Sequence, residues 1–77
     1  MGEELRNAIG KACSNIEHCI KVNKNGGFSD KSLGNFKNNN TQAFQIICDK
    51  LNVLDMNKDT WLQAIIDLSI KSNDQEL

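Results

Sequence analysis

Apolar residues in this chain recur at about every third or fourth position over three long stretches, the spacing of amphipathic helices rather than of strands. The first stretch predicts a helix from Glu3 to Lys21. Glutamates in its first turn and Lys21 in its last match the helix dipole. The apolar residues of this helix share one face: Leu5, Ile9, Ala12, Ile16 and Ile20. Cys13 and Cys19 lie at the edges of that face.

A polar segment rich in Asn and Gly follows, and these residues favour turns. A short second helix is expected over Lys31–Lys37, with Ser29 or Asp30 as its N-terminal cap. Leu33 and Phe36 lie three positions apart and so share the inner face of this helix. Three consecutive asparagines are expected to end it.

Two further helices are predicted, from Gln42 to Leu54 and from Lys58 to Lys71, the latter capped by Asn57 or Asp59. The short connection between them predicts that they pack as antiparallel neighbours. The last helix has apolar residues on two sides. One side carries Trp61, Ala64, Ile65 and Leu68, and the other carries a second ridge of Leu62, Ile66 and Ile70.

The pattern therefore predicts an all-α fold, a small four-helix domain with a long N-terminal helix, a short second helix and a C-terminal antiparallel helical hairpin. Residues 1–77 are expected to form this single helical domain, with about residues 72–77 as a frayed tail. A chain of 77 residues buries only a thin core, so each core contact matters for stability.

Composition supports a globular protein, because 39% of the residues are apolar, 25% are charged and the net charge is −1. No apolar run approaches the ~18 residues of a membrane span. The N-terminus lacks the apolar segment of a secretory signal, so a cytoplasmic location is expected. The middle of the chain is mildly basic, with four lysines and one aspartate over residues 21–41.

Catalytic and metal-binding chemistry is not predicted. The only histidine, His18, falls on the polar side of the first helix, and no base lies beside a nucleophile. Three cysteines, Cys13, Cys19 and Cys48, fit neither a disulfide framework nor zinc-ligand spacing, and we expect them to be buried. The sequence predicts a non-enzymatic protein without cofactor or metal.

The two-sided apolar pattern instead predicts a binding surface made by Leu62, Ile66, Ile70, Ile46 and Val53. The leading hypothesis is a small regulatory or adaptor domain that acts by protein–protein binding through apolar helix faces and associates with itself as a homo-oligomer. The small, Pro-free, Asn- and Lys-rich composition would suit a phage or mobile-element accessory protein.

The alternative is a helix-turn-helix DNA-binding transcriptional regulator with its recognition helix near residues 30–37. Its outward residues would be Lys31, Ser32, Asn35 and Lys37, which can contact bases and phosphates. The Asn- and Gly-rich segment before them is a poor helix, and the chain has one Arg and a negative net charge, unlike typical DNA binders. A small-ligand site at an oligomer interface is a third hypothesis.

Overall fold

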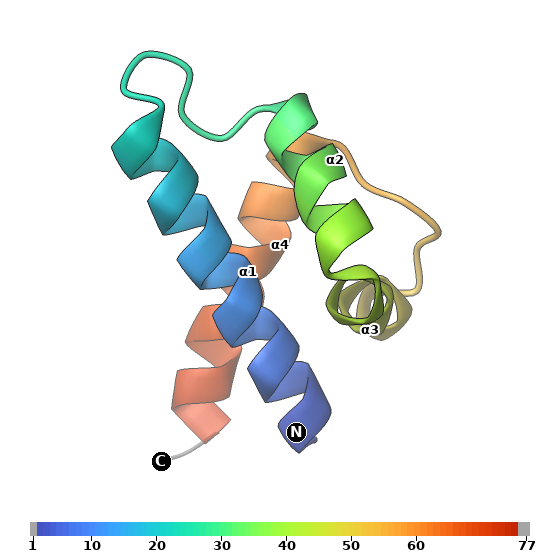
Figure 1. The fold of residues 1–77 in the computed structure, drawn as a ribbon. Helices are drawn as coiled ribbons and strands as arrows, with labels where there is room; N and C mark the ends of the chain where they lie inside the picture. The colour runs from blue at the N-terminus through green and yellow to red at the C-terminus, as the bar shows by residue number, and fades with distance from the viewer. Residues whose placement is uncertain (1, 76–77) are drawn as a thin grey trace.

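The computed structural model describes residues 2–75 and contains four helices (Figure 1). These are α1 (Glu3–Val22), α2 (Asp30–Asn39), α3 (Thr41–Leu51) and α4 (Lys58–Gln75). No strand occurs in the described part of the chain, and the all-α, four-helix class is confirmed. Helix α4 continues through residues 72–75, where fraying was expected, and residues 76–77 of the expected tail lie outside the described residues.

Helix α1 is the element on which the others assemble. It packs most extensively against α3 and also against α4, while α2 packs mainly on α3. In Figure 1, α4 lies behind α1 and runs in the opposite direction, and α3 is viewed almost along its axis. Helix α3 therefore crosses α4 steeply, and the two helices meet where the rings of Phe44 and Trp61 stack rather than as an antiparallel pair along their length.

The starts of α2 and α4 follow the sequence prediction. The hydroxyl of Ser29 accepts a hydrogen bond from the backbone N–H of Ser32 at 3.2 Å. The side-chain oxygen of Asn57 accepts one from the backbone N–H of Thr60 at 2.8 Å. Each bond satisfies one of the backbone donors that a helix leaves unpaired in its first turn, which is why Ser and Asn are favoured there.

Helix α3 ends three residues before its predicted end. Asn52 takes the left-handed conformation with φ of 59°, which Asn tolerates better than most residues. The N–H of Val53 then donates to the carbonyl of Cys48 at 3.0 Å, the bond of a Schellman helix end. Val53 and Leu54, expected inside this helix, consequently lie beyond its end, and Leu54 is 100% exposed.

Two polar contacts join elements that are distant in sequence. The carboxylate of Asp30 in α2 accepts a hydrogen bond from the backbone N–H of Lys58 at 3.0 Å, so one acidic residue serves the first turns of both α2 and α4. The ammonium group of Lys37 lies 3.5 Å from the carboxylate of Asp55 and 5.2 Å from the centre of the Phe44 ring. These contacts tie α2 to the connection before α4 and to α3.

The carboxylate of Asp55 also accepts a hydrogen bond from the backbone N–H of Met56 at 2.8 Å, and this bond, with the nearby Lys37, lowers the pKa of Asp55. A carboxylate with a lowered pKa in the folded state stabilises that state above its ordinary pKa. This stabilisation disappears as the pH falls through the lowered value. Because Asp55 is exposed, its effect is confined to acid pH and is small.

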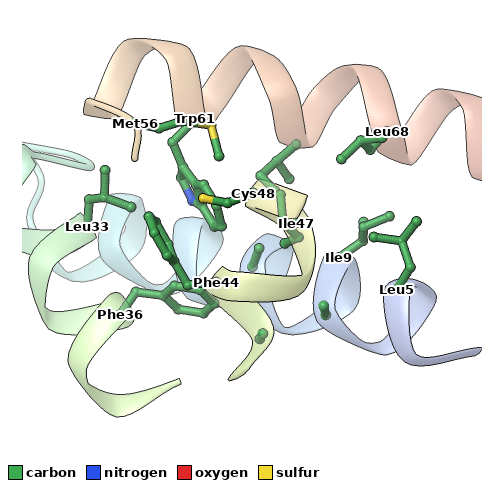
Figure 2. Packing of buried hydrophobic residues seen from close by; sticks show 14 of the residues in the cluster. Leu5, Ile9, Leu33, Phe36, Phe44, Ile47, Cys48, Met56, Trp61 and Leu68 are labelled. Atoms are coloured by element: carbon green, nitrogen blue, oxygen red, sulfur yellow. The ribbon is translucent and has the colours of Figure 1, made fainter. Parts of the chain in front are cut away.

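The hydrophobic core is centred on Trp61 of α4, which is completely buried (Figure 2). Its ring centre lies 5.1 Å from that of Phe44 and 5.5 Å from that of Phe36, so three aromatic rings from three helices meet. Met56, from the connection before α4, is also buried. The indole Nε1 of Trp61 has no hydrogen-bond partner among the described residues. The other core residues come from all four helices and the α1–α2 connection: Leu5, Ala8, Ile9, Ala12, Phe28, Leu33, Ala43, Ile47, Cys48, Ile65 and Leu68.

Glycines inside the helices give a first testable prediction. A methyl group added at Gly10 or Gly34 would meet no atom within 4 Å, so Gly→Ala at either position is expected to raise the free energy of unfolding by about 0.5–1 kcal/mol through helix propensity. Gly27, with φ of 56°, is the matched control and should lose stability on the same change. Urea denaturation followed by circular dichroism measures all three. A loss of stability in both helical variants would contradict the prediction.

Candidate functional site

An apolar groove runs between α1 and α4 and has a volume of about 500 Å³. Three of its isoleucines are more than half exposed: Ile20 at 55%, Ile66 at 54% and Ile70 at 55%. Clusters of exposed apolar side chains of this kind mark binding surfaces in proteins that otherwise cover their core. The groove is lined by Cys13, Ile16, Glu17, Ile20, Leu62, Ile65, Ile66, Ser69 and Ile70.

The length of α1 explains why this groove exists. The buried residues of α1 lie between Leu5 and Ala12, in its N-terminal half. The apolar face continues into the C-terminal half, where Ile16 is partly buried and Ile20 is exposed. The apolar stripe is thus longer than the surface that the other helices cover, and α4 forms the opposite wall of the uncovered part.

Cys13 lies in the wall of the groove. Burial raises the pKa of its thiol, the charge of Glu17 acts in the same direction, and the neighbouring Ser69 hydroxyl opposes both. Burial likewise raises the pKa of Cys48 in the core. These two thiols therefore stay protonated at neutral pH, unlike the thiolates of catalytic cysteines. Of the three cysteines, Cys48 is buried as predicted, while Cys13 and Cys19 are only partly buried.

The five residues predicted as an interface do not form one surface. Leu62, Ile66 and Ile70 lie together in the α1–α4 groove. Ile46 lines a small hollow of about 150 Å³ between α1 and α3. Val53 lines another hollow, of about 530 Å³, beside the connection to α4.

Sequence reasoning missed two residues of the groove. The helical pattern placed Ile16 and Ile20 on the apolar face of the first helix. In the structure Ile16 packs at the edge of the core, Ile20 is exposed, and both line the groove with the α4 ridge. Periodicity identifies an apolar face, and it carries no signal that tells which part of that face another helix will cover.

The four residues of the DNA-binding alternative are divided as well. Lys31, Ser32 and Asn35 line an open polar hollow of about 610 Å³ together with the α1–α2 connection, which adds Lys24. Lys37 lies apart from them, in contact with Asp55 and Phe44. The connection over residues 23–29 is also longer than the turn of about three or four residues in a helix-turn-helix motif.

Other chemistry is sparse in the part of the chain that the structure describes. His18 is exposed on α1. No group of three or more His, Cys, Asp or Glu side chains among residues 2–75 is placed to hold a metal ion. None of the helices, as far as they are described, has the length and apolar character needed to cross a lipid bilayer.

Comparisons with known proteins add no family to this description. No family model matches the chain, and neither a curated protein nor a solved structure is significantly similar to it.

Proposed function

We propose that this protein is a small non-enzymatic regulatory or adaptor domain that binds a helix of another protein in the α1–α4 groove. The observation that carries the proposal is the uncovered apolar groove with its three half-exposed isoleucines, Ile20, Ile66 and Ile70. A groove between two antiparallel helices accepts a third helix, and amphipathic helices are common ligands of such grooves.

The free energy gained by covering the groove indicates how much apolar surface the ligand must contribute. Burying the exposed halves of three isoleucines yields roughly 2–4 kcal/mol. Association costs about 4 kcal/mol or more in lost translational and rotational freedom. The ligand must therefore contribute apolar surface of similar size, as the apolar face of an amphipathic helix does. Binding is expected to be weak and reversible, which suits a regulatory contact.

The test uses the double variant Ile66→Glu with Ile70→Glu, and Leu54→Glu as the matched control. All three positions are exposed, so the variants should stay folded. Helical peptides are selected from a displayed random library against the wild-type protein, and their affinities for each variant are measured by fluorescence anisotropy. We expect at least a tenfold loss for the double variant, because it places two carboxylates in an apolar groove, and no change for Leu54→Glu.

Equal binding of the selected peptides to the wild-type protein and the double variant would contradict the proposal, since the ligand would then occupy another surface. Circular dichroism of each variant is the control for folding. An unfolded double variant would show that the second ridge belongs to the core.

DNA binding is the second candidate, favoured by the polar hollow that brings Lys31, Ser32 and Asn35 together with Lys24. It predicts affinity for duplex DNA that falls steeply as salt rises, because phosphate contacts release counterions. A titration of a mixed duplex pool at two salt concentrations, with Lys31→Ala and Asn35→Ala as variants, separates this function from groove binding.

A further inference from the structure

We infer that the helix bound in the α1–α4 groove presents a lysine or arginine to Glu17 and is a segment of a different protein rather than a second copy of this chain. The inference rests on the proposed function and adds the chemistry of the partner. Among the described residues that line the groove, Glu17 alone is charged, and the others are apolar or small.

The position of Glu17 makes its charge important for any ligand. Its carboxylate is close enough to Cys13, on the groove wall, to affect the pKa of that thiol. No ion pair joins Glu17 to a basic residue in the described part of the chain, and Lys21, one turn further along α1, is not paired with it. Glu17 is exposed in the free protein. A helix that covers the groove would remove water from its carboxylate, and an ionised group removed from water without a partner is costly.

A second copy of the chain brings no cation from the described lining of its own groove. In a two-fold dimer the same surface of each copy forms the contact. None of the described residues that line the groove is Lys, Arg or His, so pairing two grooves would place two Glu17 carboxylates in one apolar contact without a cation from that lining. Like charges brought together at an interface oppose association.

A different protein can satisfy both requirements of the groove. Its helix would carry apolar residues at positions i, i+3 or i+4, and i+7, which fill the space between Ile16 and Ile20 on α1 and Ile66 and Ile70 on α4. A lysine or arginine at the edge of that apolar face would reach Glu17. A long basic side chain can cover apolar surface with its stem and still place its charge beside the carboxylate.

The experiment uses two designed amphipathic helical peptides with the same apolar face, one with lysines and the other with glutamates at its edges. Affinities are measured by fluorescence anisotropy at constant ionic strength for the wild-type protein, Glu17→Lys, and the control Glu3→Lys, which changes the net charge equally at an exposed position on α1 outside the groove. We expect the wild type and Glu3→Lys to prefer the lysine peptide by about tenfold, and Glu17→Lys to reverse the preference.

Each other outcome overturns the inference in a distinct way. If both peptides bind equally and the double variant Ile66→Glu with Ile70→Glu abolishes both, the groove binds helices and the charge requirement is wrong. If neither peptide binds, the proposed function fails together with the inference. If sedimentation shows a dimer that the same double variant dissociates, the occupant is a second copy.

Discussion

Replacement of Trp61 by alanine is expected to lower the free energy of unfolding by about 3–5 kcal/mol, the range found when a large buried aromatic residue is truncated. A domain of this size has a total stability of roughly 4–12 kcal/mol. The loss is therefore a large part of the total, and the melting temperature should fall by about 12–40 °C. Thermal and urea denaturation followed by circular dichroism measures the effect.

The reason for this large effect is the central place of Trp61. It is 0% exposed, and its ring meets Phe36 of α2 and Phe44 of α3. Aromatic pairs add about 0.5–1.5 kcal/mol beyond the area that they bury. Alanine would remove both ring contacts and leave a cavity where α2, α3 and α4 meet.

The matched control is Trp61→Phe, which keeps an aromatic ring and removes the indole N–H. Nε1 has no hydrogen-bond partner among the described residues, so burying its N–H costs desolvation energy. Removing the N–H removes that cost, and this gain offsets part of the stability lost to the cavity that the smaller ring leaves. We expect a loss of about 1–2 kcal/mol, smaller than the loss for alanine. A loss in Trp61→Phe as large as in Trp61→Ala would show that the N–H has a favourable partner.

The second large effect is expected for Ile47→Ala, at about 2–5 kcal/mol. Ile47 lies on α3, is 0% exposed, and belongs to the core where α3 packs against α1, the most extensive contact between helices in the structure. Alanine leaves a cavity that two rigid helices cannot close by small shifts, so the lost contacts are not regained. Chemical denaturation gives the change directly.

Ile46→Ala provides the comparison, because it removes the same atoms from the adjacent residue. Ile46 is only partly buried and borders the small hollow between α1 and α3, so its truncation should cost less than about 1.5 kcal/mol. Equal losses for the two variants would contradict the assignment of faces on α3.

Local chemistry explains which parts of the fold the sequence predicts well. Ser29 and Asn57 are residue types whose side chains bond to the first turn of a helix, and both helices begin where these residues predict. Apolar periodicity placed Phe36 on the inner face of its helix and Trp61 on an apolar side of the last helix, and both are buried.

Features that depend on tertiary packing were predicted poorly. The left-handed Asn52 ends α3 early, although the apolar pattern continues to Leu54. Met56 enters the core from a connection, where periodicity carries no information. Ile16 and Ile20 continue a regular apolar face, and only the arrangement of α3 and α4 on α1 leaves them in the groove. The sequence thus predicted the residues on the α4 side of the candidate site, and only the structure identifies those on its α1 side.

The position of Trp61 along the chain also matters during synthesis, when proteins emerge from the ribosome N-terminus first. Helices α1, α2 and α3 are complete by Leu51, yet Phe36 and Phe44 have no ring to close over them until α4 has emerged. Until then the nascent chain exposes the apolar faces that later form the core. The cluster of three rings at the centre of the core can therefore close only after α4 has been made.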